Sequence, residues 1–412
     1  MKTTHRKVLS RVRVLDLSRV LAGPWASQML ADMGAEVIKV ERPGKGDDSR
    51  TFGPTFIKDK DGRDTRESAM YVSANRNKKS ITVNIARPEG QQLIRDLVAQ
   101  CDVLLENYKV GDLARYGLDY TSIRAVNPRI IYCSVTGFGQ TGPYRHRLGY
   151  DSIFQGMGGL MSVNGEPDGV PGGGPMKVGP SITDVITGLY ASNAILGALY
   201  HRDADGGVGQ YIDMALLDSV LASLSHYTAD YLISGVPPVR RGTEGNGGMP
   251  SQMFHCADSP IMLVAGNDAQ FKRLCTVLRQ PALAGDERFA TNVNRVKNRN
   301  DMTPILAGLM RQWQQQDLLA ALDKADVPAG PIYNLKEAFA DPQVRQRGLE
   351  IEVPHPLSGS VKLSSNPIRY SETPIDDYTA PPLLGAHTDA VLKDILKLDD
   401  ARLAALRAGG VI

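Results

Sequence analysis

Short apolar segments that alternate with helical segments dominate the first half of the chain. Strands are predicted at residues 12–17, 36–40, 80–85, 102–106, 129–135 and 210–214. Helices are predicted between them at 23–32, with Pro24 in the opening turn and Gly34 as the stop, and at 88–100. Strands separated by helices form βαβ units, so this pattern predicts an α/β fold with a largely parallel sheet.

The pattern changes at two glycine-rich stretches, residues 169–175 and 242–248. Between them we expect a long helix of small and apolar residues at 184–201 and, after the strand at 210–214, another helix up to about residue 232. Beyond them the sequence predicts an α/β block at 252–335, β structure at 348–371 and a helical tail at 389–407.

Composition argues against several classes of partner. Lys and Arg number 47 and Asp and Glu 45, and a net charge of +2 argues against nucleic acid as the main partner. The most apolar stretch, residues 185–200, is interrupted by polar residues, so no transmembrane helix is expected. The basic start at 1–13 lacks the apolar core of a secretory signal. The four cysteines and seven histidines show no metal-binding spacing, so we expect a cytoplasmic protein without a disulfide framework or metal site.

One glycine loop has the spacing of a dinucleotide-binding fingerprint. Gly137-Phe-Gly-Gln-Thr-Gly142 matches G-x-G-x-x-G and follows a strand, but Pro143 and a polar run stand where a helix would have to begin. The first βα turn, residues 18–24, holds one glycine where a nicotinamide site usually has three. Both features argue against a nicotinamide cofactor, while a glycine loop at a strand end suits close approach of another ligand.

Cations follow several of the predicted strands: Arg42, Lys45, Arg76, Lys78, Lys79 and Arg115. Each alone is interpretable as a solvated surface residue. As a set, they are expected outside the carboxyl ends of the strands, where open α/β sheets bind ligands, and they would suit a phosphate-bearing ligand. The residues alone leave both interpretations open.

Asp184 stands where a loop containing Gly179 and Pro180 turns into the long helix. At a helix N-terminus the dipole and free N–H groups favour an ionised carboxylate. One interpretation is an ordinary aspartate of a first helical turn. The other is a nucleophilic carboxylate that the small residues around it leave accessible to an acyl carbon.

Seven segments resemble, in the same order, those of the class III CoA-transferases, also called the formyl-CoA transferase or CaiB/BaiF family. They are residues 15–24, 34–43, 46–50, 75–80, 102–107, 127–132 and 382–388. Each is a weak signal alone, but seven in the right order are highly specific. The resemblance extends over essentially the whole chain.

The resemblance implies that Asp184 is a covalent nucleophile. It would attack the donor acyl-CoA and give a mixed anhydride plus CoA thiolate, which would then form an aspartyl-CoA thioester and release the donor acid. The acceptor carboxylate would reverse these steps. Coenzyme A is therefore expected as an acyl-CoA co-substrate, with no metal and no nicotinamide or flavin.

The resemblance also implies which residues contact the substrates. The CoA contacts of the family match Val20, Ala22, Arg42, Asn75, Arg76, Asn77, Lys78, Asn107, Arg115, Thr136, Gly137, Phe138 and Gly139. The family's glycine loop, which closes over the intermediate, matches residues 245–248, so Gly247 and Gly248 are expected to contact the substrate.

Within the family, the chain is especially similar to the succinyl-CoA:glutarate CoA-transferases. This implies transfer of CoA from succinyl-CoA to a small dicarboxylate such as glutarate. The distal carboxylate of such an acceptor needs a cation or donor cluster, and the candidates are Arg240, Arg19 and His226. Leu21 and Thr136 stand where formyl-CoA transferase has a glutamine and a lysine, which argues against oxalate as the acceptor.

Two other functions are compatible with the resemblance. A branch of the family consists of 2-methylacyl-CoA racemases, which use a histidine in a Gly-His-Asp motif as an acid and base. Here that position is Tyr150, and a phenol substitutes poorly for a base at neutral pH. The other alternative is a non-catalytic protein that binds acyl-CoA.

The family's architecture implies a Rossmann-like large domain built from both chain ends and a smaller α/β domain. The predicted ranges are 1–225 and 336–412 for the large domain and 226–335 for the small domain with its linkers. The resemblance further implies a homodimer whose two subunits interlock, each threading through the other.

Overall fold

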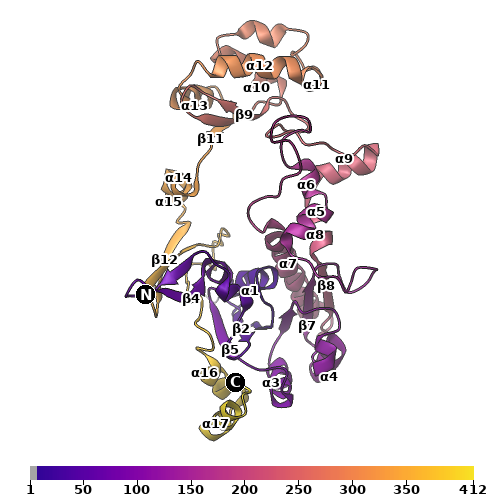
Figure 1. Ribbon diagram of the computed structural model, residues 1–412, viewed down its shortest axis with the longest axis vertical. Helices are drawn as coiled ribbons and strands as arrows, with labels where there is room; N and C mark the ends of the chain where they lie inside the picture. Colours follow the sequence, from indigo (N-terminus) through magenta and orange to yellow (C-terminus); the bar gives the residue numbers. More distant parts are fainter. Residues whose placement is uncertain (1–6) are drawn as a thin grey trace. The chain divides into compact units, whose positions relative to one another are not determined.

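A computed structural model describes residues 7–412 (Figure 1). Residues 1–6, which include Lys2 and Arg6 of the basic start, lie outside the described residues. The chain divides into two compact units. Unit 1 comprises Met1–Leu160, Val178–Ile233 and Arg345–Ile412, and unit 2 comprises Met161–Lys177 and Ser234–Val344. The predicted domain boundaries after residues 225 and 335 stay a prediction.

A parallel sheet of six strands forms the centre of unit 1. The strands are β1 (Arg13–Asp16), β2 (Glu36–Glu41), β5 (Lys78–Thr82), β6 (Val103–Glu106), β7 (Ile131–Thr136) and β8 (Tyr211–Ala215). Their order across the sheet is β5-β2-β1-β6-β7-β8, and every neighbouring pair is parallel. The predicted α/β fold with a parallel sheet is therefore confirmed. The strand order reverses between β1 and β6, which is where open α/β sheets bind ligands.

Helices cover both faces of this sheet (Figure 1). Residues such as Val14 and Ile131 pack with α1 (Ala22–Asp32), α5 (Asp151–Met157), α7 (Ile182–Asp205) and α8 (Leu216–Ser223). Residues such as Leu15 and Leu104 face the other side and pack with α3 (Pro88–Val98), α4 (Tyr120–Val126), α16 (Thr388–Leu396) and α17 (Asp400–Ala408). Burial on both faces explains why these strands are continuous apolar runs in the sequence.

The long helix α7 packs along α1. Gly188 permits the close approach, because a Cβ atom there would lie 2.7 Å from the carbonyl oxygen of Ala22 and 3.0 Å from Cβ of Trp25. Among the described residues, α7 is the one helix with the length and composition of a membrane span, a test that buried core helices also pass. The expected absence of a membrane span stays a prediction.

Several predicted helices have different bounds in the structure. The helix predicted up to residue 232 is interrupted at Ser225, where φ is 54°, and the chain continues as α9 (His226–Ser234). The helical tail is likewise interrupted at Lys397, where φ is 57°, which separates α16 from α17. A residue in the left-handed region ends an α-helix, and the apolar periodicity does not reveal it.

The smaller elements of unit 1 include two antiparallel hairpins. These elements are η1 (Asp48–Thr51), β3 (Phe56–Lys58), β4 (Asp64–Ser68), α2 (Ala69–Ser73), η2 (Leu113–Tyr116), β12 (Glu350–His355) and β13 (Gly359–Ser364). The β12–β13 hairpin confirms the β structure predicted at 348–371. The β3–β4 hairpin was not predicted.

Unit 2 has its own three-stranded sheet and core. The sheet is antiparallel in the order β11 (Ala329–Pro331), β10 (Pro260–Val264), β9 (Ser251–His255). Four helices follow these strands or lie between them: α10 (Asp268–Val277), α11 (Asn292–Lys297), α12 (Arg299–Met310) and α13 (Gln315–Lys324). Further short helices are α6 (Leu160–Val163), η3 (Pro281–Gly285), α14 (Leu335–Ala340) and α15 (Pro342–Gln346).

Candidate active site

A cavity of about 290 Å³ lies in unit 1 at the carboxyl ends of β1, β6 and β7. This position is at the reversal of the strand order, as expected for a ligand site in an open α/β sheet. The structure brings seven of the predicted site residues together on its walls: Arg19, Val20, Ala22, Asn107, Thr136, Gly137 and Asp184. They come from four separate parts of the sequence, so their meeting in one cavity is a result of the fold.

Asp184 lies in the first turn of α7 and is partly buried. No described residue donates a hydrogen bond to its carboxylate or forms an ion pair with it. Burial, together with the nearby charge of Asp151, raises the pKa of Asp184 from 3.8 to about 7. Burial and Asp151 act against the ionisation that a helix N-terminus favours, and the ionised state expected for Asp184 stays a prediction.

Asp151 takes the capping role that an ordinary aspartate of a first helical turn would have. Its Oδ1 accepts a hydrogen bond from the backbone N–H of Thr183 (2.8 Å), and its Oδ2 accepts one from Nε2 of Gln155 (2.7 Å). Asp184 makes no such bond among the described residues. Its carboxylate is therefore available to a ligand in the cavity.

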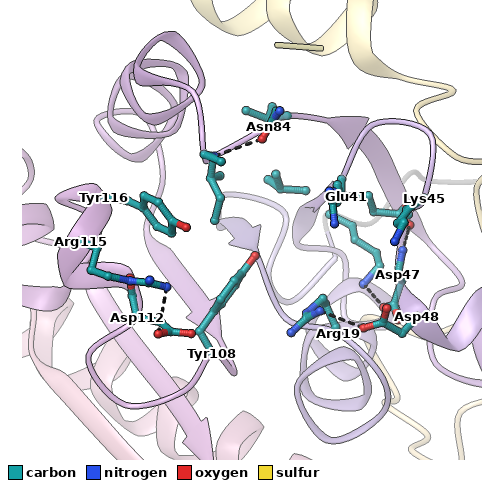
Figure 2. A pocket seen from close by; sticks show the side chains of 17 residues that line it. Arg19, Glu41, Lys45, Asp47, Asp48, Asn84, Tyr108, Asp112, Arg115 and Tyr116 are labelled. Carbon is teal, nitrogen blue, oxygen red and sulfur yellow. Dashed lines mark hydrogen bonds and ion pairs between the residues drawn. The ribbon is translucent and has the colours of Figure 1, made fainter. Parts of the chain in front are cut away.

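A second cavity, of about 360 Å³, adjoins the first and shares Arg19, Asp48 and Tyr108 with it. Figure 2 shows Tyr108, Arg115 and Tyr116 on one side of this cavity and Glu41, Lys45 and Asp47 on the other. The predicted contacts Arg42 and Arg115 line it. Cations beside aromatic rings suit a ligand that carries both phosphate groups and an aromatic base.

Two of these cations already have carboxylate partners. Nη1 of Arg19 lies 2.8 Å from Oδ2 of Asp48, and Nη2 of Arg115 lies 3.1 Å from Oδ1 of Asp112. Both pairs are largely exposed, so they are weak and exchange readily with a bound anion.

The predicted contacts at residues 75–78 line neither cavity. Nε of Arg76 donates to Oδ1 of Asp32 (3.0 Å), and Nδ2 of Asn77 donates to the same oxygen (2.8 Å). Nζ of Lys78 donates to Oδ1 of Asn75 (2.9 Å) and lies 3.2 Å from Oδ2 of the buried Asp16. Asn75, Arg76 and Lys78 are buried in this polar network and Asn77 is half-buried, and the contact of these four residues with CoA stays a prediction.

The glycine loop after β7 keeps its backbone close to the first cavity. A Cβ atom on Gly137 would lie 2.5 Å from Cζ of Phe154, so a larger residue would displace that ring. The ring of Phe138 packs edge-on against Phe154, with 5.1 Å between centroids. Gly139 has φ of 81° and donates its N–H to Oγ1 of Thr136 (3.0 Å). The chain remains non-helical until α5, as predicted from Pro143.

The remaining predicted substrate residues lie outside these cavities. In unit 2, Arg240 forms an ion pair with Asp168 and donates to the carbonyl oxygen of Glu166 (3.4 Å). Gly247 accepts a hydrogen bond from Nδ2 of Asn292 (3.0 Å), and Gly248 packs against Gly266. In unit 1, His226 begins α9, is exposed and packs against Tyr227. The role of each in acceptor binding stays a prediction.

Sequence reasoning missed one basic part of the first cavity. Arg145, His146 and Arg147 line it together with Tyr150, although the sequence presented them as a plain polar run. Their position directly before Gly149-Tyr150-Asp151 was the signal that could have identified them. Among residues 7–412, no group of three His, Cys, Asp or Glu residues has the arrangement of a metal site.

Comparison with known proteins gives full-length matches. The family model described as CoA-transferase family III matches residues 9–388. The succinate–glutarate CoA-transferase of Agrobacterium fabrum is 48% identical over 387 residues, which are 94% of this chain and 95% of that protein. The succinyl-CoA:glutarate CoA-transferase of Homo sapiens is 43% identical over 406 residues, 98% of this chain and 90% of that protein. The crystal structure of a CAIB/BAIF family protein from Brucella suis superposes with a TM-score of 0.83 at 45% identity, covering 95% of this chain and 100% of that one.

Proposed function

The chain belongs to CoA-transferase family III, and from this premise we propose that it transfers CoA from succinyl-CoA to glutarate with Asp184 as the nucleophile. The position of Asp184 is the observation that carries the assignment of the nucleophile. Its carboxylate faces the cavity at the sheet reversal and has no hydrogen-bond partner among the described residues. A nucleophile needs this combination of access and lack of competing bonds.

The proposed reaction proceeds by two exchanges at Asp184. A carboxylate oxygen of Asp184 attacks the thioester carbon of succinyl-CoA, and the C–S bond breaks to give an aspartyl–succinyl anhydride and CoA thiolate. The thiolate attacks the aspartyl carbonyl carbon and expels succinate, which leaves an aspartyl-CoA thioester. A carboxylate oxygen of glutarate then attacks the carbonyl carbon of this thioester, and the C–S bond breaks to give a second, aspartyl–glutaryl anhydride and CoA thiolate. The thiolate attacks the glutaryl carbonyl carbon, which forms glutaryl-CoA and releases the Asp184 carboxylate.

CoA is proposed to extend across the two adjoining cavities. Its phosphate groups and adenine would occupy the second cavity with Arg42 and Arg115, and its thiol end would reach Asp184 in the first. Arg19 and Tyr108 line both cavities, so an extended ligand such as CoA can contact the same side chains as it passes from one cavity into the other. The N–H group of Gly137, which lines the first cavity, is a candidate for stabilising an oxyanion at the reacting carbonyl.

Three further properties belong to the proposal. The large domain is Rossmann-like, two subunits interlock as a homodimer, and the protein acts in the cytoplasm. Sheet order and the return of residues 345–412 to unit 1 support the first of these. Family membership supports the second, and the sparse cysteines support the third.

A labelling experiment tests the proposed nucleophile. Glutarate with heavy oxygen in its carboxylates is supplied with unlabelled succinyl-CoA, and the peptide that contains Asp184 is analysed by mass spectrometry after a single turnover. The mechanism predicts one heavy oxygen on Asp184, because the bridging oxygen of the second anhydride remains with the enzyme. Glutaryl-CoA formed without label on this peptide would contradict the mechanism.

The reaction class is tested in parallel with a panel of acceptors. Glutarate, itaconate, malate, mesaconate, oxalate and carnitine are each offered with succinyl-CoA, and the new CoA ester is identified by mass. Asp184→Ala is expected to abolish transfer while its circular dichroism spectrum stays that of the wild type. Absence of transfer from every pair would overturn the proposed function.

A further inference from the structure

The turn between β1 and α1 has a backbone conformation that its sequence does not favour. Val20 has φ of 70° and is, among residues 7–412, the only β-branched residue with a positive φ. Such a residue is strained in the left-handed region, where glycine is not. The turn contains no glycine before Gly23. Its shape must therefore be held by neighbouring side chains.

Two side chains hold the residues before Val20, one from β2 and one from the residue directly after β6. Oδ1 of Asn107 accepts the N–H of Arg19 (2.9 Å), and Nδ2 of Asn107 donates to the carbonyl oxygen of Arg19 (2.7 Å). Nζ of Lys39 donates to the carbonyl oxygen of Ser18 (2.9 Å). Asn107 therefore pairs with Arg19 as a neighbouring strand would, beyond the end of β6.

Asp47 holds Val20 itself. Its Oδ1 accepts the N–H of Val20 (3.1 Å) and also accepts from the N–H (2.9 Å) and Oγ (2.8 Å) of Ser49. Its Oδ2 lies 2.8 Å from Nζ of Lys39, and both side chains are fully buried. The backbone N–H of Asp47 donates to Oε2 of Glu41 (2.9 Å), so the carboxylate has a fixed position.

These contacts place one carboxylate between the two cavities of the candidate site. Val20 lines the first cavity and Asp47 lines the second. Burial opposes ionisation of Asp47, but Lys39 and Ser49 outweigh it and lower its pKa to about 2. The hydrogen bond to Val20 is therefore a charged one at any physiological pH, and such bonds are stronger than neutral ones.

We propose that Asp47 is a positioning residue for CoA. Asp47 holds Val20 in the left-handed conformation, and this keeps the cavity wall at Val20, where the two cavities meet, in the shape that binds CoA. The inference rests on the proposed function, since it takes CoA as the ligand of these cavities. Asp47 acts here through the backbone of Val20.

A double-mutant cycle tests this role with free CoA as the probe. Asp47→Ala is expected to weaken CoA binding, measured by calorimetry, by about 10-fold or more, because Val20 relaxes out of the left-handed region. Val20→Gly removes the strain, so in that background the same Asp47→Ala change is expected to alter CoA affinity less than about 3-fold. The kcat at saturating substrate is expected to stay within about 2-fold, with the effect in KM for the CoA ester.

Thermal unfolding distinguishes a role of Asp47 in positioning Val20 from a general loss of stability in the Asp47 variant. Asp47→Ala leaves Lys39 buried without its partner, so the Tm is expected to fall, and Val20→Gly is expected to leave that fall in place. Lys397→Gly, at another positive-φ residue beyond α16 and outside both cavities, is the matched control and is expected not to restore CoA binding.

Recovery of CoA affinity in Asp47→Ala/Val20→Gly without recovery of Tm would support the inference. Equal losses of affinity in both backgrounds, or recovery of affinity and Tm together, would overturn it and leave the proposed function intact. A wild-type protein that binds no CoA would overturn both.

Discussion

Asp184→Asn is expected to make the protein more stable at alkaline pH while abolishing CoA transfer. Asp184 has a pKa of about 7 in the folded protein against 3.8 as its ordinary value, because burial and Asp151 disfavour its charge. The folded state therefore binds this proton more tightly than the unfolded state. Stability contributed by the protonated group is lost as the pH rises from about 4 through about 7.

The two pKa values set the size of this effect. Between pH 5 and pH 8, ionisation of Asp184 lowers the free energy of unfolding by ~2–3 kcal/mol, at 1.36 kcal/mol per unit of pKa shift. An asparagine does not titrate, so the free energy of unfolding of Asp184→Asn does not fall by this amount between pH 5 and pH 8. Glu67 and Glu106 also have pKa values raised to about 7, mainly by burial, and they contribute equally to both proteins.

The assay is urea unfolding of the wild type and Asp184→Asn at pH 5, 6, 7 and 8. The difference between the two free energies of unfolding isolates Asp184 and is expected to grow in favour of the variant with increasing pH. Asp61→Asn, which removes an exposed carboxylate, is the control and is expected to follow the wild-type profile. Parallel profiles for the wild type and Asp184→Asn would refute the reasoning, because they would mean that Asp184 titrates alike in both states.

Four further outcomes are expected from single substitutions. Asp151→Asn keeps an acceptor for the helix start but removes the repelling charge, so the pH below which transfer fails is expected to shift downward in a pH–rate profile. Arg76→Ala is expected to lower stability by ~3–5 kcal/mol in urea unfolding, because it leaves the buried carboxylate of Asp32 without its ion-pair partner. Arg42→Ala is expected to raise the KM for the CoA ester about 10-fold at unchanged Tm, since Arg42 is exposed and lines the second cavity. Gly188→Ala is expected to lower the free energy of unfolding by ~1–3 kcal/mol, because its methyl group meets the backbone of α1.

The sheet of unit 1 could be predicted because strands buried on both faces leave continuous apolar runs in the sequence. The β3–β4 hairpin could not, since Asp64–Ser68 is polar and mostly lacks an apolar side to bury. The break at Lys397 was also invisible, because it depends on one backbone angle rather than on a residue pattern.

The position of a site residue could be predicted where the order of the sequence segments identified it. The surroundings of a charged side chain could not, because they depend on residues far away in the sequence. Asp184 and Val20 were identified from the sequence, and the fold brings them to one cavity. Arg76 and Lys78 were predicted as CoA contacts; Asp32 and Asp16, 44 and 62 residues away, pair with them in the core, and their contact with CoA stays a prediction. A sequence shows the charge of a residue but not what will face it after folding.

The contact at Gly188 has a consequence for how the acceptor preference of such an enzyme can evolve. Helix α7, whose first turn holds Asp184, and helix α1, which follows the Val20 turn, touch one turn beyond Asp184, at a point where no side chain fits. The spacing between the proposed nucleophile and the Val20 turn is thereby set by contact of backbone with backbone, which no change of side chain can adjust. Substitutions in the loop that carries Arg145 and Arg147 can reshape the cavity and leave this spacing unchanged. We therefore expect new acceptors to be reached through changes in this loop, whereas a change at the helix crossing would move the proposed nucleophile for every acceptor at once.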